Sequence, residues 1–150
     1  MIFACVIASA SAAVWLNNHV IVNGQVISGS MEGTIMADDR VFGLRIFAQI
    51  NRGDIIVFTS PIPGETSEIF IKRVIATAGE VVEIRNGATF INGTHLAEDY
   101  LNEPMIRDFL PMTVGEGQLF VMGDNRNNSR DSRDFGTICA GSILGRIYIY

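Results

Sequence analysis

The sequence predicts an all-β, barrel-like domain that follows an apolar N-terminal segment. Short runs rich in aromatic and β-branched residues recur along the chain, as in "GDIIVF" and "FIKRVIA". Turn residues separate these runs at short intervals, and Asn86-Gly87 is a dipeptide typical of tight hairpins. Many short strands with frequent turns are characteristic of antiparallel barrels and sandwiches, so an all-β class is expected.

The expected strands follow one another with little intervening chain. In order, they are "QVI" (25–27), "RVFGLRIF" (40–47), "GDIIVF" (53–58), "FIKRVIA" (70–76), the hairpin "VVEIRNGATFING" (81–93), "GQLFVMGDN" (117–125) and "GSILGRIYIY" (141–150). The segment "LAEDYLNEPMIRDF" (96–109) fits either a helical turn or a long loop. The run 41–47 is expected to be either an exposed apolar patch or a buried core strand.

The N-terminal segment is predicted to be a membrane anchor over residues 1–22, followed by a β-rich domain over 23–150. Residues 1–16, "MIFACVIASASAAVWL", contain no charged residue, glycine or proline. Sixteen helical residues span about 24 Å, and continuing to Val22 gives about 33 Å, enough for a hydrocarbon core of about 30 Å. A cleaved signal peptide is the alternative, because "ASASAA" has the small residues of a cleavage region. However, no positively charged region precedes it.

Composition argues against several functions. The net charge is −5 and no long basic run occurs, which disfavours a nucleic-acid partner bound through phosphates. The two cysteines, Cys5 and Cys139, lie near opposite ends of the chain and are not expected to pair. His19 and His95 are isolated, so no spacing suggests a metal site, and no cofactor is predicted.

Lys72 is the only lysine in the chain, and it lies in a strand among apolar residues. Strand alternation places it on the same face as Phe70 and Val74, with Arg73 on the other face. Burial lowers the pKa of an ammonium group, and the resulting neutral amine is a base. The alternative is an edge-strand lysine that extends its amine into solvent.

Two polar segments complete the set of candidate chemical groups. "SGS" (28–30) follows an apolar run and places two hydroxyls in a flexible turn, as a nucleophilic serine requires; a plain polar turn is the alternative. "GDNRNNSRDSRDFG" (123–136) follows the apolar run "LFVM" and crowds acidic, basic and amide side chains together. Loops anchored on a strand commonly carry function, although a solvated loop with local turns is the alternative.

In this order, these segments resemble the bacterial type I signal peptidases. The motifs that carry the resemblance are "SGSMEGT", "NRGDIIVF", "FIKRVIATAGE" and "GDNRNNSRDSR", in the order and spacing of the family. The resemblance extends from the N-terminal segment to the final strand. The short stretch between Gly79 and Gly123 resembles the minimal members, which lack a large inserted second β domain.

The resemblance implies a role for each matching position. Ser30 matches the nucleophile and Lys72 the general base. Ser28 matches a side-chain donor to the oxyanion, together with the backbone N–H of Ser30. Ser129 matches the serine that orients the lysine amine. Residues expected to form supporting salt bridges near the site are Arg73, Asp131 and Arg133, with Asp124 in the same loop. Gly33 stands where the family usually has proline, which predicts a looser loop behind Ser30.

The resemblance further implies a membrane-bound serine endopeptidase that removes signal peptides from secretory preproteins after Ala-x-Ala-like sites. Its partners would be preproteins and the lipid bilayer, with the catalytic domain on the extracytoplasmic side of the cell membrane. One alternative is a non-catalytic, signal-peptidase-like chaperone of pilus assembly, a class that loses catalytic residues. Another is a cytosolic Ser-Lys autoprotease of the repressor type, which would need a DNA-binding domain upstream.

Overall fold

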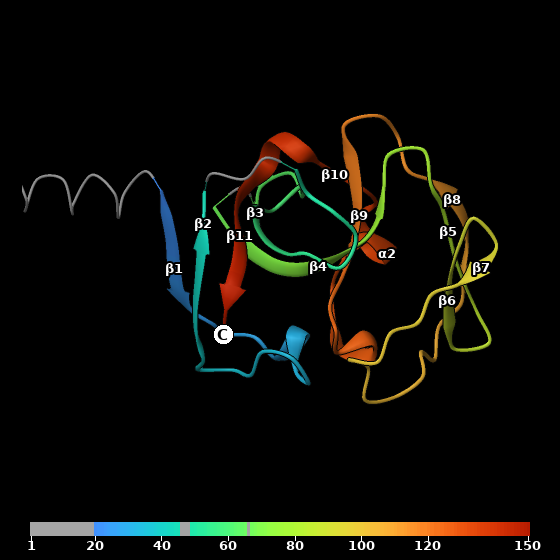
Figure 1. Cartoon of the computed structure of the whole chain (residues 1–150), viewed down its shortest axis with the longest axis horizontal. Coiled ribbons are helices and arrows are strands. Elements are labelled where there is room, and N and C mark those ends of the chain that lie inside the picture. The colour runs from blue at the N-terminus through green and yellow to red at the C-terminus, as the bar shows by residue number, and fades with distance from the viewer. Residues whose placement is uncertain (1–19, 46–48, 66) are drawn as a thin grey trace, which may run out of the picture.

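The computed structural model describes residues 20–45, 49–65 and 67–150, and its strands form two antiparallel sheets (Figure 1). The longest helix in these ranges is a single α-helical turn, α2 (Ser132–Phe135). The predicted all-β class is therefore confirmed. No helix within these ranges combines the length and apolar composition needed to cross a bilayer.

The larger sheet has seven strands in the order β1-β2-β11-β3-β4-β9-β10. It is strongly curled, with β3, β4 and β11 bending around one another (Figure 1). The register shifts between Val74 and Ala76 in β4 and between Ile143 and Gly145 in β11, and such irregularities increase local bending. Its strands are β1 (Ile21–Gln25), β2 (Arg40–Leu44), β3 (Ile55–Thr59), β4 (Ile69–Thr77), β9 (Gln118–Met122), β10 (Ile138–Cys139) and β11 (Ile143–Ile149).

A smaller sheet of four strands, in the order β7-β6-β5-β8, lies beyond β9 at one end of the molecule (Figure 1). Its members are β5 (Val81–Arg85), β6 (Ala88–Ile91), β7 (Thr94–His95) and β8 (Phe109–Thr113). The β5–β6 hairpin was predicted, and both Asn86 and Gly87 have positive φ angles, as a type I′ turn requires. The edge strand β8 was not predicted, because Pro111 interrupts its pattern; proline is tolerated only at such edges.

One hydrophobic cluster joins the two sheets and fixes the position of the loops between them. It combines residues of β4 and β9 with residues of β5 and β6, and includes Met105 from the segment before β8. Its buried members are Ile75, Ala76, Val82, Ile84, Ile91, Met105, Val114, Phe120 and Met122. Two further clusters occupy the remaining interior of the large sheet. Strand β4, which contains Lys72, and strand β9, which leads into the loop 123–136, are therefore both anchored in this core.

Two N-terminal predictions need correction. Ile21 and Val22, expected at the end of an anchor, belong to β1, and Val22 is buried in the core. Strand β1 also ends at Gln25, so the expected strand at 25–27 lies too far along the chain. Residues 1–19 of the predicted anchor lie outside the described residues. Strand β1 was missed because Asn23, Gly24 and Gln25 give it no apolar alternation.

Candidate active site

Ser30 lies in a 3-10 turn, Gly29–Met31, directly after the loop that follows β1. Ser28 caps this turn with extended backbone geometry, and its hydroxyl accepts a hydrogen bond from the Ser30 N–H at 3.2 Å. Met31 is buried in the core beneath the turn. The cap and the buried methionine together hold the Ser30 hydroxyl at the surface of the domain, where a substrate can reach it.

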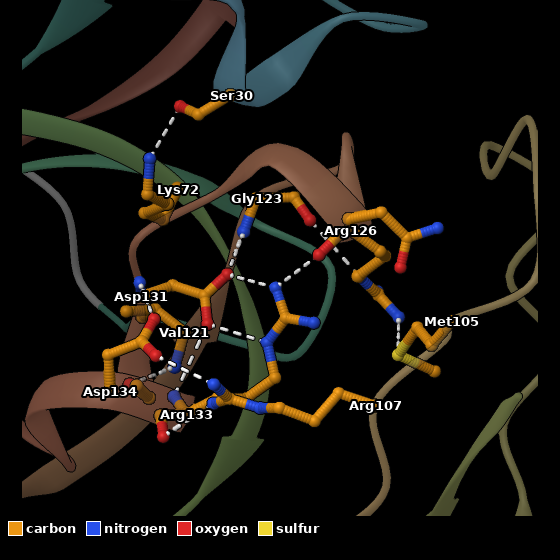
Figure 2. A network of polar contacts seen from close by, with 12 residues as sticks. Ser30, Lys72, Met105, Arg107, Val121, Gly123, Arg126, Asp131, Arg133 and Asp134 are labelled. Carbon is orange, nitrogen blue, oxygen red and sulfur yellow. Dashed lines mark hydrogen bonds and ion pairs between the residues drawn. The ribbon is translucent and has the colours of Figure 1, made fainter.

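Lys72 projects from the middle of β4 toward Ser30, and its Nζ donates a hydrogen bond to Ser30 Oγ at 2.5 Å (Figure 2). The residue is only 4% exposed, and its amine lies 5.6 Å from the centre of the Phe70 ring. The lysine and the serine are separated by 42 positions in the chain, so the fold, not local sequence, brings them together. The expectation of a solvent-extended lysine is therefore wrong.

The surroundings of Lys72 lower the pKa of its amine. Burial lowers the pKa of Lys72 from an ordinary value of 10.5 to about 8. The carboxylates of Asp131 and Asp124 act in the opposite direction, and the Arg133 charge acts in the same direction as burial. A base with a pKa near ambient pH is suited to accept a proton from a hydroxyl.

A cleft of about 830 Å³ opens in front of Ser30 and Lys72. Much of its wall is apolar, and it is built from β1, β4 and the loop that carries Ser30. Val57 of β3 and Phe70 and Ile71 of β4 line it. Its further apolar lining residues are Val22, Val26, Ile27, Val41 and Leu144. An extended, mainly apolar peptide segment fits such a cleft.

Asp131 and Arg133 form one of the predicted supporting ion pairs (Figure 2). Two nitrogens of Arg133 donate to the two carboxylate oxygens of Asp131, each at 2.8 Å. Asp131 also caps α2 and accepts from the N–H of Gly123 at 3.1 Å, and Arg133 donates to the Arg126 carbonyl at 2.6 Å. This pair therefore folds the loop 123–133 back onto the end of β9.

Arg73 pairs with Asp124, so the support predicted from the sequence consists of two separate ion pairs. Its guanidinium donates to both Asp124 oxygens, at 2.9 and 2.6 Å. The Thr34 hydroxyl donates to the same carboxylate at 2.5 Å. The Asp124 side chain is fully buried, and although burial opposes it, the hydrogen bond to this carboxylate raises the pKa of Arg73. The predicted alternation of side chains along β4 is confirmed: Lys72 bonds Ser30 on one face, and Arg73 bonds Asp124 on the other.

The predicted hydrogen bond between Ser129 and Lys72 is not formed. The Ser129 hydroxyl is buried and has no hydrogen-bond partner in the part of the chain that the structure describes. The hydrogen bond of the Lys72 amine goes to Ser30 instead. Ser129 nevertheless lies beside the site, because a Cβ added at Gly123 would collide with both its hydroxyl and the carbonyl of Ser30. Glycine is therefore required at position 123 for this close approach.

The backbone at Gly33 shows why glycine stands where the family usually has proline. Its φ angle is +99°, which proline cannot adopt, and a Cβ there would lie 2.7 Å from the side-chain nitrogen of Asn102. The loop behind Ser30 is also hydrogen-bonded, since the N–H groups of Thr34 and Ile35 both donate to the Met31 carbonyl. The backbone at position 33 is thus fitted to the segment that contains Asn102.

One buried polar cluster near the site was missed by sequence reasoning. Arg126 has a completely buried side chain, and it donates to both oxygens of Glu98, at 2.9 and 2.5 Å. Tyr100 donates from its hydroxyl to Glu98 at 2.6 Å, and its ring lies 4.0 Å from the guanidinium carbon of Arg73. Arg126 belongs to the motif "GDNRNNSRDSR", but nothing in the sequence of residues 96–109 indicated that Glu98 would be its partner.

Comparisons with known proteins find a matching family, related sequences and a related structure. A family model described as "Signal peptidase, peptidase S26" matches residues 1–150. Signal peptidase I of Bacillus amyloliquefaciens is 37% identical in an alignment of 152 positions, gaps included; the alignment covers 91% of this chain and 77% of that protein. A crystal structure of a signal peptidase I from Enterococcus faecalis matches with a TM-score of 0.59 and 39% identity, covering 67% of this chain and 97% of the other.

Other relatives are longer than this chain. Thylakoidal processing peptidase 1, chloroplastic, of Arabidopsis thaliana is 36% identical over 130 residues, which cover 79% of this chain but 38% of that protein. Probable signal peptidase I-1 of Synechocystis is 40% identical over 126 residues, covering 79% of this chain and 64% of that protein. The chain thus spans between about a third and two thirds of the length of these two relatives.

Proposed function

Because the chain belongs to the signal peptidase family, peptidase S26, we propose that it is a serine endopeptidase that removes signal peptides from secretory preproteins. The observation that carries this proposal is the 2.5 Å hydrogen bond between the Lys72 amine and the Ser30 hydroxyl. A hydroxyl becomes a useful nucleophile when a base lies within hydrogen-bond reach, and Lys72 meets this condition. Neither His19 nor His95 is needed as a base in this scheme.

Acylation begins with neutral Lys72. Its Nζ takes the proton of the Ser30 hydroxyl as Ser30 Oγ attacks the carbonyl carbon of the scissile peptide bond. The tetrahedral intermediate collapses when the ammonium of Lys72 returns the proton to the leaving amine, and the signal peptide remains esterified to Ser30. A water molecule then attacks the ester, with Lys72 again accepting and returning the proton.

The negative charge of the tetrahedral intermediate would be stabilised by the Ser28 hydroxyl and the Ser30 N–H. In the free protein these two groups are bonded to each other, with Ser28 Oγ as the acceptor. Substrate binding therefore exchanges this hydrogen bond for two donors aimed at the oxyanion. Removing one such donor typically costs about 3–4 kcal/mol of transition-state stabilisation.

From the family membership we propose that cleavage follows Ala-x-Ala-like sites, and the largely apolar wall of the cleft is compatible with such a peptide. The wall of the cleft includes the edge strand β1, along which a substrate strand can pair. Such a peptide emerges from a bilayer-embedded signal sequence, so the proposal includes a membrane location with the β domain on the extracytoplasmic side. Phe42 and Leu44 of β2 are 43% and 39% exposed, and this apolar face is consistent with contact with lipid.

The two alternatives have less support. A non-catalytic chaperone of pilus assembly would not need Ser30 and Lys72 in hydrogen-bond contact, and the relatives cited above are all named as peptidases. A cytosolic autoprotease of the repressor type shares the Ser-Lys pair, and it would cleave its own chain. Incubating the purified chain without a substrate separates that activity from cleavage of preproteins.

The direct test is cleavage of a model preprotein in detergent by three versions of the chain. The unchanged protein is expected to release the signal peptide. Ser30→Ala removes the nucleophile, and Lys72→Arg keeps a positive charge that cannot act as a base at physiological pH, so both are expected to be inactive. Full activity of either variant would refute the proposed mechanism.

A further inference from the structure

Residues 98–107, which we call the brace, have no part in the chemistry described above, yet they contact the loop 123–134, Arg73 of β4 and Gly33 behind Ser30. The brace connects β7 to β8 of the small sheet. Along the loop 123–134 it makes polar contacts at three places: Glu98 with Arg126, Glu103 and the Pro104 carbonyl with Asn127, and Arg107 with Asp134. A surface connection with this many contacts to one loop is a candidate for a positioning element.

The first anchor of the brace is the buried pair Glu98–Arg126. The side chains are 4% and 0% exposed, and Arg126 also donates to the carbonyl of Gly123 at 3.1 Å and to the Thr89 hydroxyl at 3.2 Å. A buried guanidinium is tolerated only when it is paired and hydrogen-bonded. The loop 123–134 therefore cannot keep this conformation without a carboxylate from the brace.

Tyr100 connects the Glu98–Arg126 pair to the Arg73–Asp124 pair. Its hydroxyl donates to Glu98, while its ring lies against the guanidinium of Arg73, which in turn holds both oxygens of Asp124. An arginine cation over an aromatic face is attracted by the ring quadrupole, most strongly when both groups are shielded from water. Tyr100 thus contacts both ion pairs.

The contacts of Asp124 and its neighbour lead directly to the proposed nucleophile. Asp124 accepts from Thr34, three residues beyond the turn that carries Ser30. The N–H of Asn125 donates to the Ser30 carbonyl at 3.1 Å, and its side-chain amide donates to the Gly29 carbonyl at 3.0 Å. The position of Arg73 on Asp124 therefore affects the backbone that presents Ser30.

We propose that Tyr100 is a positioning residue for the Ser30–Lys72 pair: its ring holds the Arg73 guanidinium on Asp124 and so fixes the loop that supports Ser30. This inference rests on the proposed function for its catalytic consequence. The packing of Asn102 against Gly33 provides a second contact between the brace and the loop behind Ser30.

The same geometry predicts an electrostatic effect on Lys72. The charged groups that act on it are Asp131, Asp124 and Arg133. While Arg73 stays on Asp124, much of that carboxylate charge is neutralised. When the ring is lost, Arg73 is held less firmly, the charge of Asp124 acts more strongly on Lys72, and its ammonium form becomes more stable.

The test compares Tyr100→Leu, which removes the ring, with Tyr100→Phe, which keeps the ring and loses only the hydroxyl. Phe90→Leu is the matched control, because the Phe90 ring also lies against an arginine, Arg85, at 3.8 Å, on the small sheet. Lys72 is the only lysine, so isotope-labelled lysine gives one signal whose titration midpoint can be followed in each variant. Cleavage kinetics and thermal unfolding are measured in parallel.

Tyr100→Leu is expected to raise the Lys72 midpoint and to lower kcat by about tenfold, with KM within about twofold. Tyr100→Phe and Phe90→Leu are expected to resemble the unchanged chain in both respects. An unchanged midpoint in folded Tyr100→Leu overturns the proposal, as does an equal rise in Phe90→Leu. If the Ser30→Ala protein still cleaves preprotein, the proposed function fails, whereas the Lys72 midpoints still decide whether Tyr100 positions the pair.

Discussion

At the scale of single residues, the site depends on the amine of Lys72 and on the absence of a side chain at Gly123. Lys72 is 4% exposed and touches Ser30, and burial lowers the pKa of its amine, which makes the neutral form easier to reach. Gly123 lets the loop after β9 approach the carbonyl of Ser30. The sequence marked Lys72 as a lone lysine among apolar residues but left a solvent-extended amine open, and the structure shows the buried arrangement. The sequence could not indicate the role of Gly123, since close approach is a property of the tertiary structure.

Gly123→Ala is expected to destabilise the protein and to lower its activity. The added methyl group meets the Ser30 carbonyl and the Ser129 hydroxyl, so the loop or the serine turn must move, at a cost of about 1–3 kcal/mol. Denaturant unfolding and cleavage kinetics measure the two effects. Gly115→Ala is the control, because the nearest atom to its Cβ is 3.7 Å away. Equal behaviour of the two variants would contradict the close approach at Gly123.

At the scale of elements, the sequence predicted strand β4 and the loop 123–136, but it did not predict that the segment 96–109 packs against them. Strand β4 has the apolar pattern of a buried strand, and its alternation placed Lys72 and Arg73 on opposite faces. The segment 96–109 has no regular pattern, and its 96–108 part folds into neither helix nor strand. Its order comes from Glu98, Tyr100 and Asn102 meeting residues far along the chain, which periodicity cannot reveal.

Glu98→Gln is expected to destabilise the protein by about 3–5 kcal/mol, because it leaves the buried Arg126 charge without its counter-ion. Glu83→Gln provides a matched comparison. Glu83 pairs with Arg85, but those side chains are 24% and 44% exposed, so the loss is expected to stay below about 1 kcal/mol. Chemical denaturation of both variants measures the difference. Similar losses in the two proteins would be inconsistent with a buried, paired Arg126.

At the scale of the whole molecule, the antiparallel all-β class and most strands followed from residue patterns, whereas the division into two sheets did not. Strand order depends on which apolar faces meet, and the cluster that joins the sheets contains residues from Ile75 to Met122. The weakly patterned strands β1 and β8 were missed for the same reason: tertiary pairing overrides local preference there.

The stability of the whole domain should depend on the protonation of Lys72. Its pKa is about 8 in the folded state and 10.5 ordinarily, so the unfolded chain binds more protons between these values. Stability contributed by this residue therefore rises with pH from 8 to 10.5 and is lost as pH falls through 8, a total of about 3 kcal/mol.

Lys72→Met removes this dependence and leaves the other titrating groups in place. The difference in unfolding free energy between the variant and the unchanged chain is expected to favour the variant most below pH 8 and to shrink as pH rises to 10. Urea unfolding at several pH values measures it. A difference that stays constant across this range would mean that folding does not perturb the amine.

The central claim is that the fold holds the Lys72 amine largely desolvated beside the Ser30 hydroxyl. An NMR titration of the unchanged chain, with isotope-labelled lysine, reads this amine alone because the sequence contains no other lysine. The structure predicts a midpoint near 8, far below the ordinary 10.5. A midpoint at the ordinary value would contradict the claim.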